Sequence, residues 1–170
     1  MPDQATGAAG IRPWEEIEFR PMTLDDVPAI VEIERQVFTA PWSPEAFANE
    51  LKHNHFARYL VMVTDGRIIG YGGMWTIIDE AHVTNIAVRD GWRGRGYGER
   101  LMRELQKLAV RHGSTAMTLE VRVTNEIAQR LYRKLGFKPN GLRPKYYTDN
   151  QEDALIMWAD LAEEGATGKQ

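Results

Sequence analysis

The stretch Arg93-Gly94-Arg95-Gly96-Tyr97-Gly98 lies between the apolar run Thr84-Asn85-Ile86-Ala87-Val88 and a series of apolar residues at helical spacing. The run is typical of a strand, and Leu101, Leu105 and Leu108 repeat as on a helix packed against a core. Three glycines between these elements allow the backbone to turn tightly. At a helix start, the exposed N–H groups and the positive end of the helix dipole form a cradle suited to phosphate.

Two common phosphate-binding motifs do not fit this loop. The motif G-x-G-x-x-G fails because Glu99 stands where a count from Gly94 requires the third glycine. The P-loop fails because no Gly-Lys-Ser/Thr follows. The alternative is a glycine-rich turn with charged residues and no ligand.

The composition limits the class of protein. A chain of 170 residues is long enough for one domain with a full core, and 43% hydrophobic with 26% charged residues is ordinary for a globular protein. A net charge of −3 argues against nucleic-acid binding as the main function. The chain has no cysteine, which excludes disulfides, cysteine zinc sites and a cysteine nucleophile.

The chain also lacks signals for a membrane or a metal. No apolar run approaches the ~20 residues that span a bilayer. Residues 1–10 do not resemble a secretory signal, so we expect a cytoplasmic protein. His53 and His55 have no further ligand at metal spacing, and we expect them on the surface, with no metal bound.

The pattern along the chain predicts one α/β domain with a mixed sheet and the order β-α-α-β-β-β-α-β-α-β-β. Helices are expected after Thr23, after Ser43, after the glycine loop and after Asn125. Asp65-Gly66 predicts a hairpin. Strands are expected over residues 17–20, 59–63, 68–75, 81–88, 117–123, from 137 onward and over 154–158. We expect a disordered tail over residues 1–14, the domain over 15–161 and a frayed end over 162–170.

Several strings, taken in order, resemble the GNAT superfamily of acetyltransferases from about Phe19 to Leu161. The glycine loop matches its Arg/Gln-x-x-Gly-x-Gly/Ala motif. The other strings are Phe19-Arg20-Pro21-Met22-Thr23, Ala40-Pro41-Trp42-Ser43, Asn85-Ile86-Ala87-Val88, Leu119-Glu120-Val121-Arg122, Leu131-Tyr132-Arg133-Lys134-Leu135-Gly136-Phe137 and Tyr146-Tyr147. Within the superfamily the chain is similar to the bacterial RimI-type alanine N-acetyltransferases of ribosomal proteins.

The resemblance implies a GNAT-like domain whose mixed, mostly antiparallel sheet is flanked by helices. It also implies acetyl-CoA as co-substrate and the N-terminal α-amine of a protein as acceptor. The similarity to the RimI-type enzymes implies that this protein is ribosomal. The residues expected to bind acetyl-CoA are Ile86, Ala87, Val88, Arg93, Gly94, Arg95, Gly96, Tyr97, Gly98, Glu99 and Asn125. Glu99 departs from the family, which often has Arg or Lys there, and we expect its side chain to point away from the cofactor.

The chemistry of acetyl transfer to an amine requires a neutral amine and a protonated leaving thiolate. With a pKa of ~8, roughly a tenth of a peptide α-amine is neutral at pH 7, whereas lysine at ~10.4 is about one part in 2,500 neutral. A moderate base is therefore sufficient. The resemblance assigns this role to Glu120, which alternation alone would make a solvent-facing strand residue; His82 is the second candidate.

Other site residues have a functional and a purely structural interpretation. The resemblance makes Tyr132 the proton donor to CoA, although its spacing also fits core packing. Asn125 is a candidate contact to the pantetheine arm or simply a helix cap. Residues 86–88 offer backbone groups to the same arm or belong only to the core.

The acceptor side is less defined by sequence. Trp42, Tyr146 and Tyr147 are candidates for a peptide channel by resemblance, or packing lids. Without a cysteine or a Gly-x-Ser-x-Gly motif, we expect direct transfer in a ternary complex and no acyl-enzyme. The alternatives are acetylation of a lysine or a small amine on the same fold, and a non-catalytic CoA-binding module.

Overall fold

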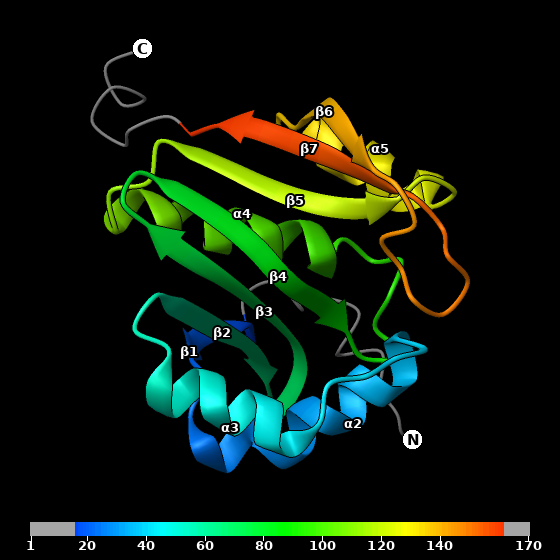
Figure 1. The fold of residues 1–170 in the computed structure, drawn as a ribbon. Coiled ribbons are helices and arrows are strands. Elements are labelled where there is room, and N and C mark those ends of the chain that lie inside the picture. Colours follow the sequence, from blue (N-terminus) through cyan, green and yellow to red (C-terminus); the bar gives the residue numbers. More distant parts are fainter. Residues whose placement is uncertain (1–15, 162–170) are drawn as a thin grey trace.

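Residues 16–161, which the structure describes, form a seven-stranded sheet with helices on both faces in this computed structural model (Figure 1). The strands are β1 (Glu18–Pro21), β2 (Ala57–Thr64), β3 (Arg67–Ile77), β4 (Glu80–Val88), β5 (Ala116–Arg122), β6 (Lys138–Arg143) and β7 (Ala154–Asp160). The helices are a 3-10 turn, η2 (Leu24–Asp26), and α2 (Val27–Val37), α3 (Pro44–His53), α4 (Tyr97–Arg111) and α5 (Glu126–Lys134). The predicted tail over 1–14 and the predicted frayed end over 162–170 lie outside the described residues.

The strand order in the sheet is β1-β2-β3-β4-β5-β7-β6. β4 and β5 run parallel, and every other pair of neighbours is antiparallel. The predicted element order is confirmed when the short η2 turn is counted with α2, which follows it directly. The predicted mixed, mostly antiparallel sheet is confirmed as well.

Local sequence signals fix many of the element ends. Asp65 and Gly66 have φ angles of 51° and 71°, which suits the tight hairpin turn between β2 and β3. The Ser43 hydroxyl accepts a hydrogen bond from the Ala46 N–H at 3.1 Å, and Pro44 is the first residue of α3. Both features were predicted from sequence.

Helix ends follow the same logic. Thr23 and Asp26 form the predicted capping box, although the chain makes one 3-10 turn before α2 begins. Gly113 and Gly136, with φ angles of 90° and 99°, follow α4 and α5 in the left-handed region that glycine tolerates. The two helices therefore end where the sequence predicts.

The two faces of the sheet are covered by different helices (Figure 1). Ile30 of α2 and Phe47 of α3 are fully buried in one cluster with Tyr71 of β3. On the opposite face, Met102 and Leu105 of α4 are fully buried in a second cluster that includes residues of β5, α5 and β7. This burial of apolar side chains on both faces is the main stabilising contribution.

The sheet opens at its centre. β4 and β5 pair only over Glu80–His82 and Ala116–Thr118, and beyond this point the strands separate (Figure 1). Thr84 forms a β-bulge, because its neighbours Val83 and Asn85 pair with adjacent residues of β3. A bulge increases the local twist of its strand, which helps β4 to turn away from β5. The opening holds the candidate site.

Candidate active site

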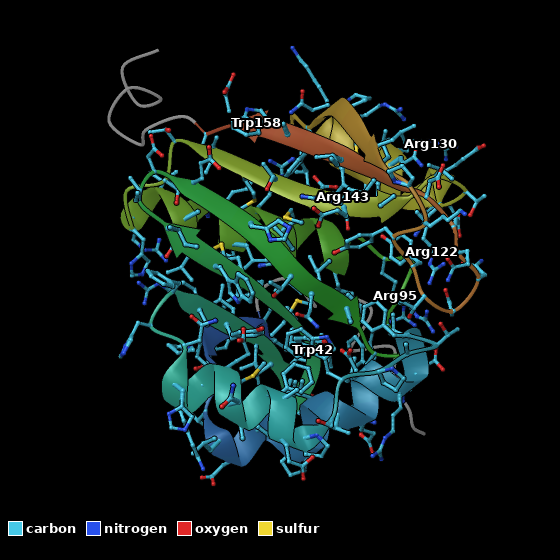
Figure 2. All side chains as sticks on the ribbon, viewed as in Figure 1. Trp42, Arg95, Arg122, Arg130, Arg143 and Trp158 are labelled. Atoms are coloured by element: carbon cyan, nitrogen blue, oxygen red, sulfur yellow. The ribbon has the colours of Figure 1, made fainter. Side chains whose placement is uncertain are left out.

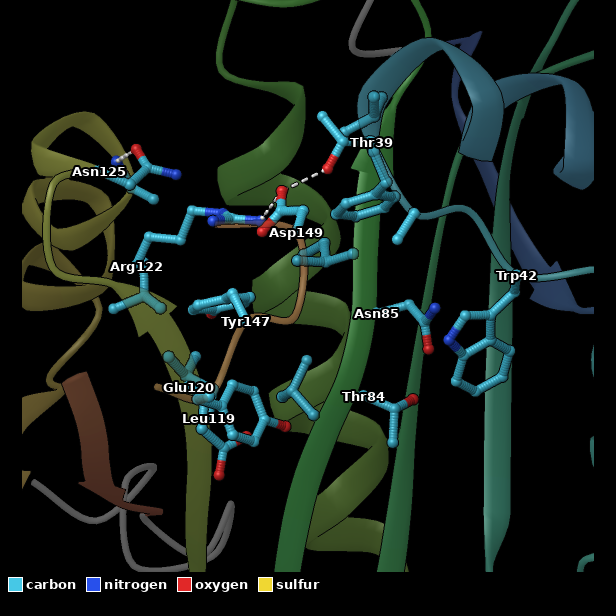
Figure 3. Close-up of a pocket in the computed structure, with 18 of the residues that line it drawn as sticks. Thr39, Trp42, Thr84, Asn85, Leu119, Glu120, Arg122, Asn125, Tyr147 and Asp149 are labelled. Carbon is cyan, nitrogen blue, oxygen red and sulfur yellow. Dashed lines mark hydrogen bonds and ion pairs between the residues drawn. The ribbon is translucent and has the colours of Figure 1, made fainter. Parts of the chain in front are cut away.

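A cavity of about 610 Å³ occupies the opening between β4 and β5 (Figure 3). Its walls come from α2, β4, β5, α5 and the loops that follow α2 and β6. Seven of the predicted site residues line it: Trp42, Ile86, Glu120, Asn125, Tyr132, Tyr146 and Tyr147. The remaining predicted residues, Ala87, Val88 and the glycine loop from Arg93 to Glu99, are not part of its wall.

The open edge of β4 gives the cavity a row of backbone groups. Since β5 turns away after Thr118, β4 has no partner strand on this side from Val83 onward within residues 16–161. The side chains of Ala87 and Val88 are buried in the core. For these two residues only the backbone can face a ligand.

The glycine loop links β4 to α4. Gly94 and Gly96 have φ angles of 79° and 86°, and Gly96 is the N-cap of α4 with no side chain to occupy the helix end. The side chain of Tyr97 is 2% exposed and packs edge-on against Trp92, with ring centroids 5.6 Å apart. The loop thus presents backbone N–H groups and a helix N-terminus, which is a general anion site.

Glu99 lies in the first turn of α4, where a carboxylate interacts favourably with the helix dipole. Its carboxylate pairs with Lys134 at 2.9 Å and with Arg103 at 2.8 Å, and these two cations lower the pKa of Glu99. The two cations compensate the negative charge that Glu99 brings close to the loop.

Glu120 is held by two basic side chains. Its carboxylate side chain is 8% exposed and lies 2.7 Å from His82 Nε2 and 3.1 Å from Arg143 Nε. Burial opposes its negative charge, but the hydrogen bonds and charges of His82 and Arg143 outweigh this effect and lower the pKa of Glu120. Glu120 is therefore a charged acceptor at neutral pH.

Tyr132 is the buried phenol of the cavity. It is 8% exposed and packs against Phe137, with ring centroids 5.7 Å apart, so the expected core contact exists. Burial raises the pKa of Tyr132 to about 12. The phenol accordingly stays protonated across the neutral range while it lines the cavity.

Asn125 caps α5, because its side-chain oxygen accepts the Ala128 N–H at 3.1 Å (Figure 3). The structural interpretation of this residue is confirmed. The cap uses the amide oxygen, and Asn125 also lines the wall of the cavity.

Aromatic rings cover the side of the cavity formed by loops. Tyr146 and Tyr147 meet edge to face at 5.1 Å, and the Arg122 guanidinium stacks on Tyr147 at 4.0 Å. Trp42 packs on Phe47 at 5.1 Å. Trp42 and Tyr147 lie on opposite sides of the cavity (Figure 3).

Two buried polar residues of the cavity, Glu34 and Asn85, were missed by the sequence analysis. Glu34 is 2% exposed, accepts the Trp42 backbone N–H at 3.0 Å and is hydrogen-bonded by the Tyr71 hydroxyl. Burial raises the pKa of Glu34 to about 7. Asn85 is 6% exposed, and its side-chain oxygen has no hydrogen-bond partner in the described part of the chain. Both interrupt apolar patterns, which was the available signal.

A contact also closes one end of the cavity. Thr39, after α2, donates a hydrogen bond of 2.6 Å to Asp149, between β6 and β7, and Asp149 pairs with Arg122 (Figure 3).

Over residues 16–161 there is no cluster of three or more acidic, histidine or cysteine side chains arranged for a metal ion. In the same residues, no helix is both long enough and apolar enough to cross a membrane.

Comparison with known proteins identifies the family. Residues 27–137, more than half of the chain, match the Acetyltransferase (GNAT) family. The chain belongs to the GNAT acetyltransferase family. The family predicted from sequence is therefore confirmed, and the glycine loop and the opening between β4 and β5 both lie within the matched segment.

The relatives of this GNAT protein share a narrower description. A Bacillus subtilis protein provisionally named ribosomal protein bS18-alanine N-acetyltransferase is 46% identical over 144 residues, covering 85% of this chain and 95% of that protein. The Mycobacterium tuberculosis N-alpha-acetyltransferase RimI is 38% identical over 154 residues, covering 86% and 94%. The crystal structure of the Escherichia coli ribosomal-protein-S18-alanine N-acetyltransferase superimposes with a TM-score of 0.79 at 30% identity, covering 86% and 94%. The predicted RimI-type resemblance and N-acetyltransferase class agree with these names.

Proposed function

We propose that this GNAT protein transfers the acetyl group of acetyl-CoA to the N-terminal α-amine of a ribosomal protein whose first residue is alanine. The observation that carries the proposal is the 46% identity, over nearly the whole length of both chains, to a relative named for that activity. The cavity supports it, because an acidic side chain and a protonated phenol face the same space. The roles assigned below belong to this proposal.

The chain offers two features that fit acetyl-CoA, which supplies an activated acetyl thioester. The open edge of β4 at Ile86–Val88 provides backbone groups for an extended amide-containing arm. The left-handed Gly94 and Gly96 at the start of α4 provide N–H groups for a pyrophosphate, with Arg93 and Arg95 adding positive charge. No Cβ could sit at Gly94 without backbone strain.

Glu120 is the proposed general base. It lies in the cavity wall and stays ionised at neutral pH, and a weak base is sufficient because roughly a tenth of an α-amine is already neutral at pH 7. Its lowered pKa makes it a poor base for lysine, whose ammonium holds its proton far more tightly. The electrostatics of Glu120 thus favour an α-amine over a lysine as acceptor.

Tyr132 is the proposed general acid. Because burial raises its pKa to about 12, the phenol of Tyr132 is protonated at neutral pH. It can therefore donate a proton to a leaving thiolate, whose thiol has an ordinary pKa of ~8.5. In this proposal a backbone N–H on the open edge of β4 near Ile86 polarises the carbonyl oxygen of the thioester. The amine nitrogen bonds to the acetyl carbon and loses a proton to Glu120, while the carbon–sulfur bond breaks. The sulfur receives the proton of Tyr132, and Tyr132 regains a proton from solvent.

Trp42, Tyr146 and Tyr147 are the proposed walls for the acceptor peptide. They come from the loops after α2 and β6, and all three line the cavity. Flat aromatic surfaces contact an extended peptide with little loss of side-chain entropy. Glu34 supports this side, because it holds the backbone of Trp42.

The test uses two peptides with the same sequence, beginning with Ala-Arg and containing one internal lysine. One peptide has a free N-terminus and the other an N-terminus blocked in advance, and the release of the CoA thiol is followed with each. The proposal predicts release with the free peptide alone. Equal release with both peptides would move the activity to the lysine, and release with neither would contradict the proposal.

A further inference from the structure

The hydrogen bond between His82 and Glu120 joins two separate cavities. Glu120, on β5, lines the cavity of about 610 Å³ between β4 and β5, here called the central cavity. His82, on β4, lines a second cavity of about 340 Å³ with Trp75, Asp79 and Glu80, here called the outer cavity. The His82 side chain is 37% exposed and that of Glu120 is 8% exposed. The pair therefore leads from the buried site to an opening on the surface.

The two residues meet at the point where the sheet opens. His82 is the last residue of β4 that pairs with β5, opposite Thr118, and Glu120 lies two residues further along β5. Arg143 reaches Glu120 from β6, and Figure 2 shows its side chain on the same side of the sheet as Trp42. The Glu120 carboxylate thus bonds to His82 with one oxygen and to Arg143 with the other.

The proposed reaction has to release one proton. A charged α-ammonium has three N–H bonds and the product amide has one, so two protons leave the nitrogen. One is matched by the proton that the thiolate gains, and the other must reach solvent. Glu120 receives it on a side chain that is only 8% exposed, and the guanidinium of Arg143 beside it has no acceptor atom for a proton.

We propose that His82 is a positioning residue that acts through Glu120 and passes the reaction proton from the central cavity to solvent. While Glu120 is ionised, the Nε2–H of neutral His82 donates to its carboxylate, and exchange with water moves the ring proton to Nδ1. In this second tautomer His82 accepts at Nε2 the proton that Glu120 has taken from the ammonium. The imidazolium then loses its Nδ1 proton through the outer cavity, which regenerates the Glu120 carboxylate and the neutral imidazole that donates to it from Nε2. The inference rests on the proposed acetyl transfer and adds a residue to it.

Several charged groups surround this pair. Glu120 faces His82 from β5, Arg143 acts on Glu120 from β6, and Tyr146 lies near Glu120 in the loop before β7. On the other side, Trp75 of β3 stands edge-on to the imidazole at 6.5 Å. Glu80 and Asp79 lie beside His82 in the outer cavity, and Glu50 of α3 holds the Trp75 indole at 2.7 Å.

The relay predicts a pH dependence of the reaction rate that requires the His82 imidazole. A protonated imidazole cannot accept another proton, so the relay predicts that the rate falls towards acid pH. An amide at this position can hold Glu120 in place but cannot carry a proton away. The two roles of His82, holding and relaying, are therefore separable.

The test measures kcat/KM for the free Ala-Arg peptide against pH in wild type, His82→Gln, His82→Ala and Arg143→Gln. We expect His82→Gln to lose about a hundredfold in kcat/KM, at the low end for acid–base contributions, and to lose the acid limb, which is the fall in rate towards acid pH. Arg143→Gln serves as the matched control: it removes the other donor to Glu120, and it retains the limb. Added imidazole restores the rate of His82→Ala, whose missing ring opens onto the outer cavity, and has no effect on Arg143→Gln.

A wild-type pH profile that persists in His82→Gln, together with no rescue of His82→Ala by imidazole, would overturn the relay. Loss of activity in both His82 variants with an unchanged profile shape and no rescue would also overturn it, leaving a purely structural role. The same assay contains the wild-type protein as a reference. Absence of thiol release from wild type contradicts the proposed function itself, so the two failures are distinguishable.

Discussion

Glu34 places a carboxyl group in the apolar layer between α2 and the sheet. It is 2% exposed, it is hydrogen-bonded by the Trp42 N–H and the Tyr71 hydroxyl, and its pKa is raised to about 7 because burial disfavours the charged form. Replacing it by glutamine keeps the shape and an oxygen acceptor for Trp42. The substitution removes the ability to ionise and turns an amide N–H₂ towards the Tyr71 hydroxyl, which must then accept instead of donate, as it would from a protonated carboxyl group.

The sign of the effect follows from proton binding. Between the ordinary value of 4.5 and about 7, Glu34 binds a proton in the folded state and has lost it in the unfolded state. The free energy of unfolding contributed by this group is therefore complete below 4.5 and is lost as pH rises towards 7. At about 1.4 kcal/mol per pH unit, the displacement from 4.5 to about 7 amounts to roughly 3 kcal/mol.

Urea unfolding of wild type and Glu34→Gln at a series of pH values measures this difference. The stability of wild type relative to the variant should fall by up to ~3 kcal/mol between about pH 5 and about pH 8. Glu32→Gln is the control, because Glu32 lies on the same helix but is exposed and pairs with Arg89, which lowers its pKa. A difference between wild type and Glu34→Gln that stays constant with pH would refute the reasoning.

Three further predictions concern the proposed acetyl transfer. Tyr132→Phe should lower kcat by about 10²–10⁴-fold while the affinity for acetyl-CoA, measured by calorimetry, stays the same; an unchanged kcat would refute its role as acid. Glu120→Gln should lower kcat/KM for the peptide by a similar factor, since an amide takes up no proton, and full activity would exclude it as base. Gly94→Ala, at φ 79°, should cost ~1–2 kcal/mol of stability and weaken acetyl-CoA binding. Gly113→Ala, at φ 90° beyond the other end of α4, should cost a similar amount of stability with binding intact; equal binding in both variants would contradict the cradle.

Much of the fold could be predicted because its signals are local. The Asp65-Gly66 turn, the Ser43 and Asn125 caps and the glycine after each of α4 and α5 act within one or two turns of chain. Alternation in β5 correctly predicted that Leu119 and Val121 are buried, but it placed Glu120 towards solvent, whereas that side chain is only 8% exposed. The family strings then supplied the order in which these elements pack.

The electrostatics of the site could not be predicted in the same way. The His82–Glu120 contact joins residues 38 positions apart, and it exists because β4 and β5 are parallel neighbours. The bulge at Thr84 has no residue signature of its own, yet it places Asn85 in the cavity wall. Glu34 stood on the apolar stripe of α2, where its position already indicated burial; its partner Tyr71 depends on tertiary packing.

The central claim is that the acetyl group goes to an N-terminal α-amine. Tandem mass spectrometry of one peptide, beginning with Ala-Arg and carrying an internal lysine, locates the product after incubation with the protein and acetyl-CoA. The account predicts the acetyl group on the α-amine with the lysine unmodified. An acetyl group on the lysine with a free N-terminus would contradict it.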